Sequence, residues 1–107
     1  MKFNSQICTT REQSERLLAL GVKEETADFP VWGTEKLLYM GWSLHRLIEM
    51  IQEVCKQVII ISHRVDIRSN VKRIAYSFDV CDNLYDNIID GIEWLIKEGY
   101  FNKEYLV

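Results

Sequence analysis

The spacing of apolar residues changes once within residues 71–99, and this change constrains the fold more than any other feature of the chain. Between residues 73 and 80 every second residue is apolar, which predicts a strand with one buried face. The apolar members are Ile74, Tyr76, Phe78 and Val80. From Asp82, which is expected to cap a helix, the apolar residues recur at intervals of three and four as far as Gly99. This pattern predicts an amphipathic helix over residues 82–98 that packs on the strand.

Two neighbouring segments extend this unit. Residues 57–63 are rich in β-branched residues and apolar on both faces, which predicts an interior strand or one that is covered twice. The polar residues 66–70 are expected to turn the chain back, giving an antiparallel hairpin over about residues 57–80. Residues 43–56 carry a helical apolar stripe behind Ser43, a favoured N-cap, and predict a second amphipathic helix.

The first third of the chain adds one helix and a further helical turn. Residues 7–21 predict a helix that ends at Gly21. A capping box is expected at its start, formed by Thr9 or Thr10 with Glu12 or Gln13. Residues 23–28 suit one more helical turn.

Pro30, the single proline, breaks the pattern that precedes it. Residues 36–40 favour a short strand over a helical turn, and this strand is expected to join the sheet of the hairpin. Residues 1–107 therefore predict one α+β domain. A small antiparallel sheet carries the two helices at about 43–56 and 82–98, with an N-terminal helix alongside.

Composition narrows the class of protein. The chain is 48% hydrophobic and 27% charged, which is typical of a folded globular domain. Its formal net charge of −3 predicts no overall attraction to nucleic acid or to an anionic membrane. No apolar run approaches the roughly 18 residues that span a bilayer, and the first residues lack the apolar core of a signal peptide. We therefore expect a cytoplasmic protein without membrane contact, in which Cys8, Cys55 and Cys81 are free thiols.

Residues that could carry catalysis are few. His45 falls on the polar side of its helix and His63 ends a strand, and neither is accompanied by a nucleophile motif. The acids Asp82, Asp86 and Asp90 share one helix stripe, which is either a solvated face or a cation site. We predict no catalytic residue, no metal and no cofactor. A hydrolase or nuclease that uses His63 with nearby acids is the enzymatic alternative.

Two sets of side chains are candidate contacts for a partner. The basic set consists of Arg64, Arg68, Lys72 and Arg73. It is expected around the tip of the hairpin, where it would bind phosphate or an acidic partner, or else keep the hairpin soluble. Aromatic stacking partners are missing there, since Tyr76 and Phe78 are assigned to the core. The tryptophans Trp32, Trp42 and Trp94 form the second set, which either marks a contact surface or covers the core.

Several short segments of the sequence also occur together in other proteins. They are residues 9–21 (TTREQSERLLALG), 25–28 (ETAD), 42–50 (WSLHRLIEM), 83–86 (NLYD) and 93–100 (EWLIKEGY). In this order they resemble a group of small uncharacterised proteins encoded by prophages and mobile elements of gut Bacteroides-type bacteria. Residues 31–40 match least. Lys23 and Glu24 stand where the group has Asp-Pro, which implies a weaker cap for the following turn. The resemblance implies a phage-linked origin and transfers no activity to any residue.

These observations favour a non-enzymatic module that acts by protein–protein contact, with a homodimer as one form of that contact. The partner protein is not identified by the sequence. The alternative is a nucleic-acid-binding accessory protein that uses the basic hairpin.

Overall fold

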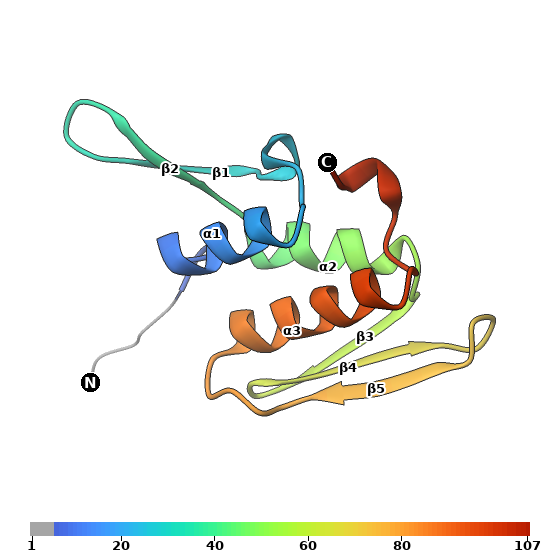
Figure 1. Ribbon diagram of the computed structural model, residues 1–107. Helices are drawn as coiled ribbons and strands as arrows, with labels where there is room; N and C mark the ends of the chain where they lie inside the picture. The colour runs from blue at the N-terminus through green and yellow to red at the C-terminus, as the bar shows by residue number, and fades with distance from the viewer. Residues whose placement is uncertain (1–5) are drawn as a thin grey trace.

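The computed structural model describes residues 6–107 and confirms the α+β class, with three α-helices and two small antiparallel sheets in that range (Figure 1). The elements in chain order are α1 (Arg11–Ala19), β1 (Phe29–Trp32), β2 (Leu37–Gly41), α2 (Leu44–Gln52), β3 (Gln57–Ile61), β4 (Arg64–Ser69), β5 (Ile74–Phe78) and α3 (Leu84–Lys97). Short 3₁₀ turns occupy Glu24–Thr26 and Lys103–Tyr105, and the first of these is the predicted extra turn.

Residues 57–78 form three strands in the order β3-β4-β5, where the sequence predicts a two-stranded hairpin. The expected turn at residues 66–70 is wrong, because most of that segment belongs to β4. Val65 and Ile67 are fully buried, and the polar residues that alternate with them, Arg64, Asp66 and Arg68, point to the opposite face of the sheet. The chain reverses at Ser62–His63, where Ser62 has a φ of 57°, and again at residues 70–73.

This arrangement makes β3 an edge strand, so the expectation of an interior strand is wrong for the single chain. β5 turns its predicted face, with Ile74, Tyr76 and Phe78, toward the helices, but this face is less completely buried than expected. Tyr76 is half exposed and Val80, beyond the strand, is almost fully exposed, because β5 is the other edge and α3 does not cover it completely.

The helices α2 and α3 pack on one face of the three-stranded sheet, and no described element covers the other face (Figure 1). The core lies between these layers. Its fully buried members include Leu47 and Ile51 from α2, Val65 and Ile67 from β4, and Ile88, Ile92 and Leu95 from α3. Burial of each such side chain contributes about 1.5–3 kcal/mol. Gly91 lets α3 approach β4, since a Cβ there would lie 2.7 Å from Ile67 Cδ1. The close neighbours of Gly91 are side-chain atoms, from Ile67 and Phe78.

Helix boundaries follow local capping chemistry. Thr10 and Gln13 form the predicted capping box of α1, and Ser43 caps α2 by accepting a hydrogen bond from the Arg46 N–H. The predicted cap of α3 is wrong by one residue: Asn83, not Asp82, accepts from the Asp86 N–H at 3.1 Å. The second helix ends at Gln52, four residues before its predicted end.

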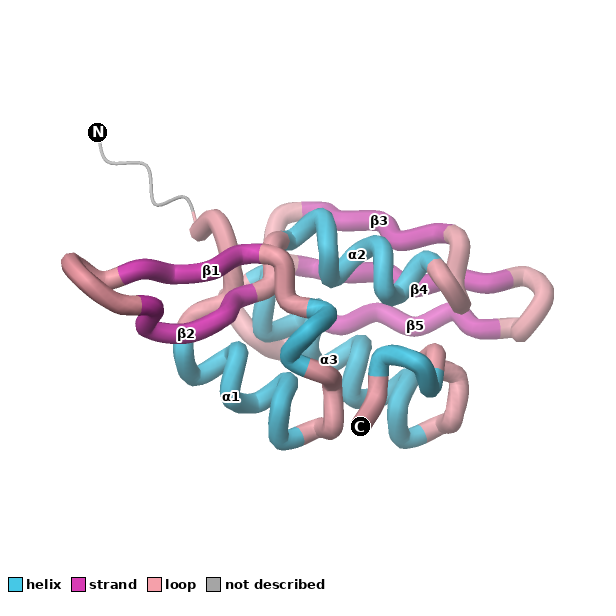
Figure 2. The backbone as a smooth tube through the Cα atoms, turned by 90° about the horizontal axis from the view of Figure 1, so that it is seen from above, coloured by secondary structure: helices cyan, strands magenta, loops and turns pink. Residues whose placement is uncertain are grey.

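The strand predicted at residues 36–40 is present one residue later, as β2, but it pairs with β1 and not with the sheet of residues 57–78. Pro30 lies within β1 opposite Met40, so it does not break structure there. Proline is tolerated in a strand only where its nitrogen faces away from the partner strand. The β1–β2 hairpin, called the arm below, projects from the body of the molecule in two perpendicular views (Figures 1 and 2).

Candidate interaction site

The three tryptophans have different environments, so they do not form one contact surface. Trp42 is fully buried and its Nε1 donates to Thr26 Oγ1 at 2.9 Å, which makes its assignment to an interaction surface wrong. Trp94 is half-buried against Tyr76, with the ring centroids 4.4 Å apart. Trp32, at the end of β1, is 65% exposed. Among the tryptophans, Trp32 is therefore the one that offers its ring to a partner.

The arm that carries Trp32 is exposed at its tip and fixed at its base. Trp32 lies opposite Leu37, and both Leu37 and Leu38 are 42% exposed. At the base, the Thr9 N–H donates to the Trp42 carbonyl at 2.9 Å and the Tyr39 hydroxyl donates to the Thr9 carbonyl at 3.1 Å. An isolated two-stranded hairpin is marginally stable, so these contacts are what hold the arm in position.

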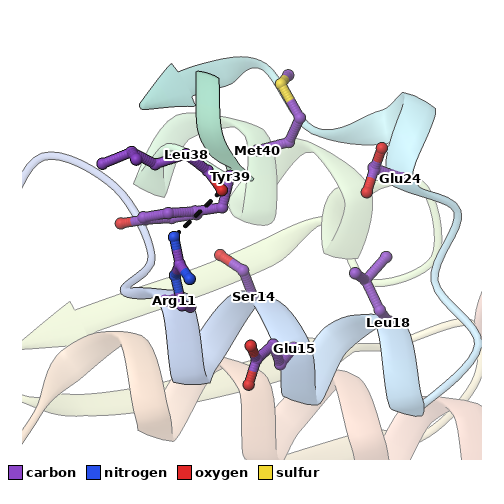
Figure 3. Close-up of a pocket in the computed structure, with 8 residues that line it drawn as sticks. All are labelled: Arg11, Ser14, Glu15, Leu18, Glu24, Leu38, Tyr39 and Met40. Atoms are coloured by element: carbon purple, nitrogen blue, oxygen red, sulfur yellow. Dashed lines mark hydrogen bonds between the residues drawn. The ribbon is translucent and has the colours of Figure 1, made fainter. Parts of the chain in front are cut away.

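A groove of about 240 Å³ lies between the arm and α1 (Figure 3). Its lining residues are Arg11, Ser14, Glu15, Leu18, Glu24, Leu38, Tyr39 and Met40. Leu18, Leu38 and Met40 supply apolar surface. Glu15 and Glu24 are exposed and form no ion pair within residues 6–107. The groove is therefore apolar in its middle with acidic residues along α1 and the following turn.

Arg11 closes one end of this groove. Its Nη2 donates to the Leu38 carbonyl at 3.2 Å, as the dashed line in Figure 3 shows, and its guanidinium lies 5.6 Å from the centroid of the Tyr39 ring. The Ser14 hydroxyl is already bonded to Thr9 and to the Thr10 carbonyl, so it is committed to the fold. Glu15, Leu18 and Glu24 were not predicted as site residues. Glu15 and Leu18 lie on α1 and Glu24 lies in the 3₁₀ turn that follows it, and only the tertiary structure brings them beside β2.

The three cysteines are free thiols, as predicted. Burial raises the pKa of Cys8 and of Cys55 above the ordinary thiol value. The pKa of Cys81 is raised by burial and by the nearby carboxylate of Asp90, which lies 3.7 Å from its Sγ. A thiol whose pKa is raised stays protonated at neutral pH and is a weak nucleophile.

The predicted basic residues do not gather at one hairpin tip. Arg64 and Arg68 flank Asp66 on β4, on the sheet face that lies opposite the helices. Lys72 and Arg73 lie in the β4–β5 turn at the other end of the sheet from Arg64, and Lys72 Nζ sits 5.8 Å from the centroid of the Tyr100 ring. The reason is that residues 64–69 form a strand, which carries Arg64 away from the turn.

Asp66 takes up part of this positive charge. It is 3% exposed, accepts from the Ser77 hydroxyl at 2.7 Å and lies 3.2 Å from Arg64 Nε. The Ser77 hydrogen bond, together with the charges of Arg64 and Arg68, lowers the pKa of Asp66. The carboxylate is thus ionised and held within the sheet.

Neither histidine lies in a catalytic arrangement in the described part of the chain. His45 is exposed on α2 and lies 3.7 Å from Glu49. His63 is in the β3–β4 turn, where its carbonyl accepts from the Asn87 amide at 2.7 Å. Asn87, which sequence reasoning missed, is fully buried and also bonds both backbone groups of Cys81. It therefore fixes the β3–β4 turn and the loop that follows β5, which lie at the same end of the sheet, to α3.

Two acidic residues of α3 connect this helix to α1. Asp86 accepts from the Gln13 amide at 2.8 Å, and Asp90 pairs with Arg16 at 2.6 Å. Within residues 6–107, no group of three or more His, Cys, Asp or Glu side chains lies close enough to hold a metal ion.

No protein-family model, curated protein or solved structure matches this chain. None of the described helices has the length and apolar character needed to cross a membrane.

Proposed function

We propose that this chain is a non-enzymatic protein-interaction module that binds its partner through the arm and the adjoining groove. The observation that carries the proposal is the 65% exposure of Trp32 on a hairpin that projects from the body of the molecule. Tryptophan is enriched among the residues that dominate binding energy at protein interfaces. An exposed tryptophan beside Leu37 and Leu38 is a surface that gains from burial against a partner.

The groove indicates the chemistry of that partner. The apolar side chains of Leu18 and Leu38 suit a partner segment that buries apolar side chains against them. The carboxylates of Glu15 and Glu24 favour basic side chains on the same segment. We therefore expect a partner segment that combines apolar residues with lysine or arginine. The raised pKa values of the three thiols disfavour a thiolate nucleophile.

The test begins with capture of binding proteins from the cells that make the chain, followed by calorimetry with the purified partner. Trp32→Ala is expected to weaken binding by about 2 kcal/mol, roughly thirtyfold. Val71→Ala is the matched control, because Val71 is an apolar residue that is 94% exposed at a different turn. Equal affinities of the Trp32→Ala variant and the unaltered protein would contradict the proposal.

Nucleic-acid binding is the second candidate. It is favoured by the position of Arg64 and Arg68 on a sheet face that no described element covers. It ranks lower because Asp66 lies between them and because Tyr76 and Phe78, the aromatic residues of β5, are on the helix side of the sheet. Base stacking would have no ring on the open face.

The origin of the chain is a separate proposal. Its resemblance to prophage and mobile-element proteins supports a phage-linked gene whose product acts in the cytoplasm. The neighbouring genes test the origin, and fractionation of the host cell tests the location.

A further inference from the structure

The edge strand β3 has the composition of an interior strand. Its residues Val58, Ile59, Ile60 and Ile61 are all β-branched and apolar. Ile59 is 38% exposed and Ile61 is 53% exposed. Natural proteins normally protect an open sheet edge with a charged residue, a proline or a bulge. The five residues of β3 contain no charge or proline, and their pairing with β4 is regular.

The backbone of β3 has hydrogen-bonding groups directed away from β4. Ile61 and Arg64 flank the two-residue loop Ser62–His63, and residues in that position exchange hydrogen bonds with each other. Because bonded and non-bonded pairs alternate, the N–H and C=O groups of Val58 and Ile60 point to the open edge. No residue within 6–107 outside the sheet bonds to them.

We propose that β3 pairs with β3 of a second copy of this chain, antiparallel and about a two-fold axis at Ile59, which joins two three-stranded sheets into one of six strands. In this register Val58 lies opposite Ile60 of the second copy, and these are the residues whose backbone groups face outward. Ile59 meets its own counterpart as a non-hydrogen-bonded pair, in which side chains approach most closely.

The placement of charged residues is compatible with this self-pairing. The register places Gln57 opposite Ile61 and Lys56 opposite Ser62, so no like charges face each other across the seam. Arg64 and Arg68 lie one strand behind it. In such a dimer β3 becomes the interior strand that its composition predicts, and the disagreement between sequence and single-chain structure disappears.

The small area of the proposed interface limits the affinity of the dimer. A pair of five-residue strands buries less than the roughly 800 Å² per partner of a standard interface. We therefore expect a concentration-dependent dimer and not a permanent one. The inference concerns a surface separate from the arm, so it stands or falls independently of the proposed function.

Sedimentation velocity over a wide range of protein concentration tests the dimer with two lysine variants. Ile59→Lys leaves the folded monomer intact, because position 59 lies opposite Asp66 on the exposed sheet face. In the dimer it brings two lysines together at the two-fold axis. Ala75→Lys is the matched control, since it places the same charge on the same sheet face at the other edge strand, β5. Circular dichroism verifies that both variants are folded.

We expect the unaltered chain and Ala75→Lys to dimerise with increasing concentration, and Ile59→Lys to stay monomeric. Amide hydrogen exchange locates the seam: exchange at Val58 and Ile60 should slow at high concentration, while exchange at Ala75 and Ser77, the outward residues of β5, should not change. A monomer at every concentration, an Ile59→Lys variant that dimerises equally, or protection confined to β5 would each overturn the proposal.

Discussion

At the residue scale, Asp66 is held by several polar contacts within the sheet. Its carboxylate is buried, bonded to the Ser77 hydroxyl and flanked by two arginines, and its pKa is lowered. A lowered pKa in the folded state means that this group contributes stability at pH values above its unfolded pKa of about 3.9. That contribution is lost as the pH falls through the lower folded value.

Replacement of Ser77 by alanine should therefore raise the pKa of Asp66 and lower the free energy of unfolding by about 1–2 kcal/mol at pH 7. The difference from the unaltered protein should shrink in acid, where Asp66 is protonated in both. A carboxyl NMR titration and urea unfolding at several pH values measure the two effects. Thr34→Ala, which removes an exposed hydroxyl from the arm loop, serves as control. An unchanged Asp66 pKa would refute this account.

Two residues other than glycine have positive φ in the described chain, namely Ser62 at 57° and Arg73 at 55°. The left-handed conformation costs a residue with a side chain roughly 1–2 kcal/mol in the folded state. Glycine removes this cost, but it also increases the conformational entropy of the unfolded chain, which offsets part of the gain. Arg73→Gly should therefore stabilise the protein by up to about 1 kcal/mol in urea denaturation. Lys72→Gly, one residue earlier and without positive φ, should destabilise it. The argument fails if both glycine variants lose stability equally.

At the element scale, α1 is attached to α3 by both polar and apolar contacts, and their magnitudes differ. Arg16 pairs with Asp90 and Glu93, and Lys97 followed by Arg16 lowers the pKa of Glu93. These groups are about one-third exposed, so solvent screens the pair and its contribution is below about 1 kcal/mol. Leu17 on the same helix is fully buried.

We expect Leu17→Ala to lower the free energy of unfolding by about 2–5 kcal/mol, because it leaves a cavity between α1 and the core. Arg16→Ala should cost less than about 1 kcal/mol, and that cost should decrease in high salt. Chemical denaturation of both variants at low and high ionic strength measures the contrast. A larger cost for Arg16→Ala would mean that the ion pairs, not burial, hold this helix.

The helices and the sheet were predictable from the sequence to different degrees. The caps of α1 and α2 depend on residues three positions apart, so the sequence contains all the information needed to locate them. The cap of α3 was misplaced because Asp82 and Asn83 are both suitable, and only the path of the chain selects Asn83. Part of β4 was mistaken for a turn because Asp66 and Arg68 are polar. The hydrogen bond from Ser77 that accommodates Asp66 comes from another strand, and the spacing of residues within 66–70 gives no indication of it.

At the scale of the whole molecule, two electrostatic effects act on an anionic ligand in opposite directions. The net charge of −3 repels it, whereas Arg64 and Arg68 attract it locally. If the chain is a protein-interaction module, single- and double-stranded oligonucleotides should show no salt-sensitive binding at low ionic strength. Fluorescence anisotropy with labelled DNA and RNA between low and physiological salt measures this. Binding that weakens steeply with salt and is lost in Arg64→Ala and Arg68→Ala would instead favour the second candidate function.

By itself the sequence determined the α+β class, the helices with their first two caps and the strand predicted at residues 36–40. These depend on periodicity and on contacts between near neighbours. The free state of the thiols followed from the number and spacing of the cysteines. Only the tertiary structure decided that Trp42 is buried while Trp32 is exposed, that β4 lies between β3 and β5, and that the arm meets α1 to form a groove. The physical reason is that burial and strand order depend on which segments, distant in sequence, pack against each other and exclude water. The local spacing of residues along the chain does not specify that packing.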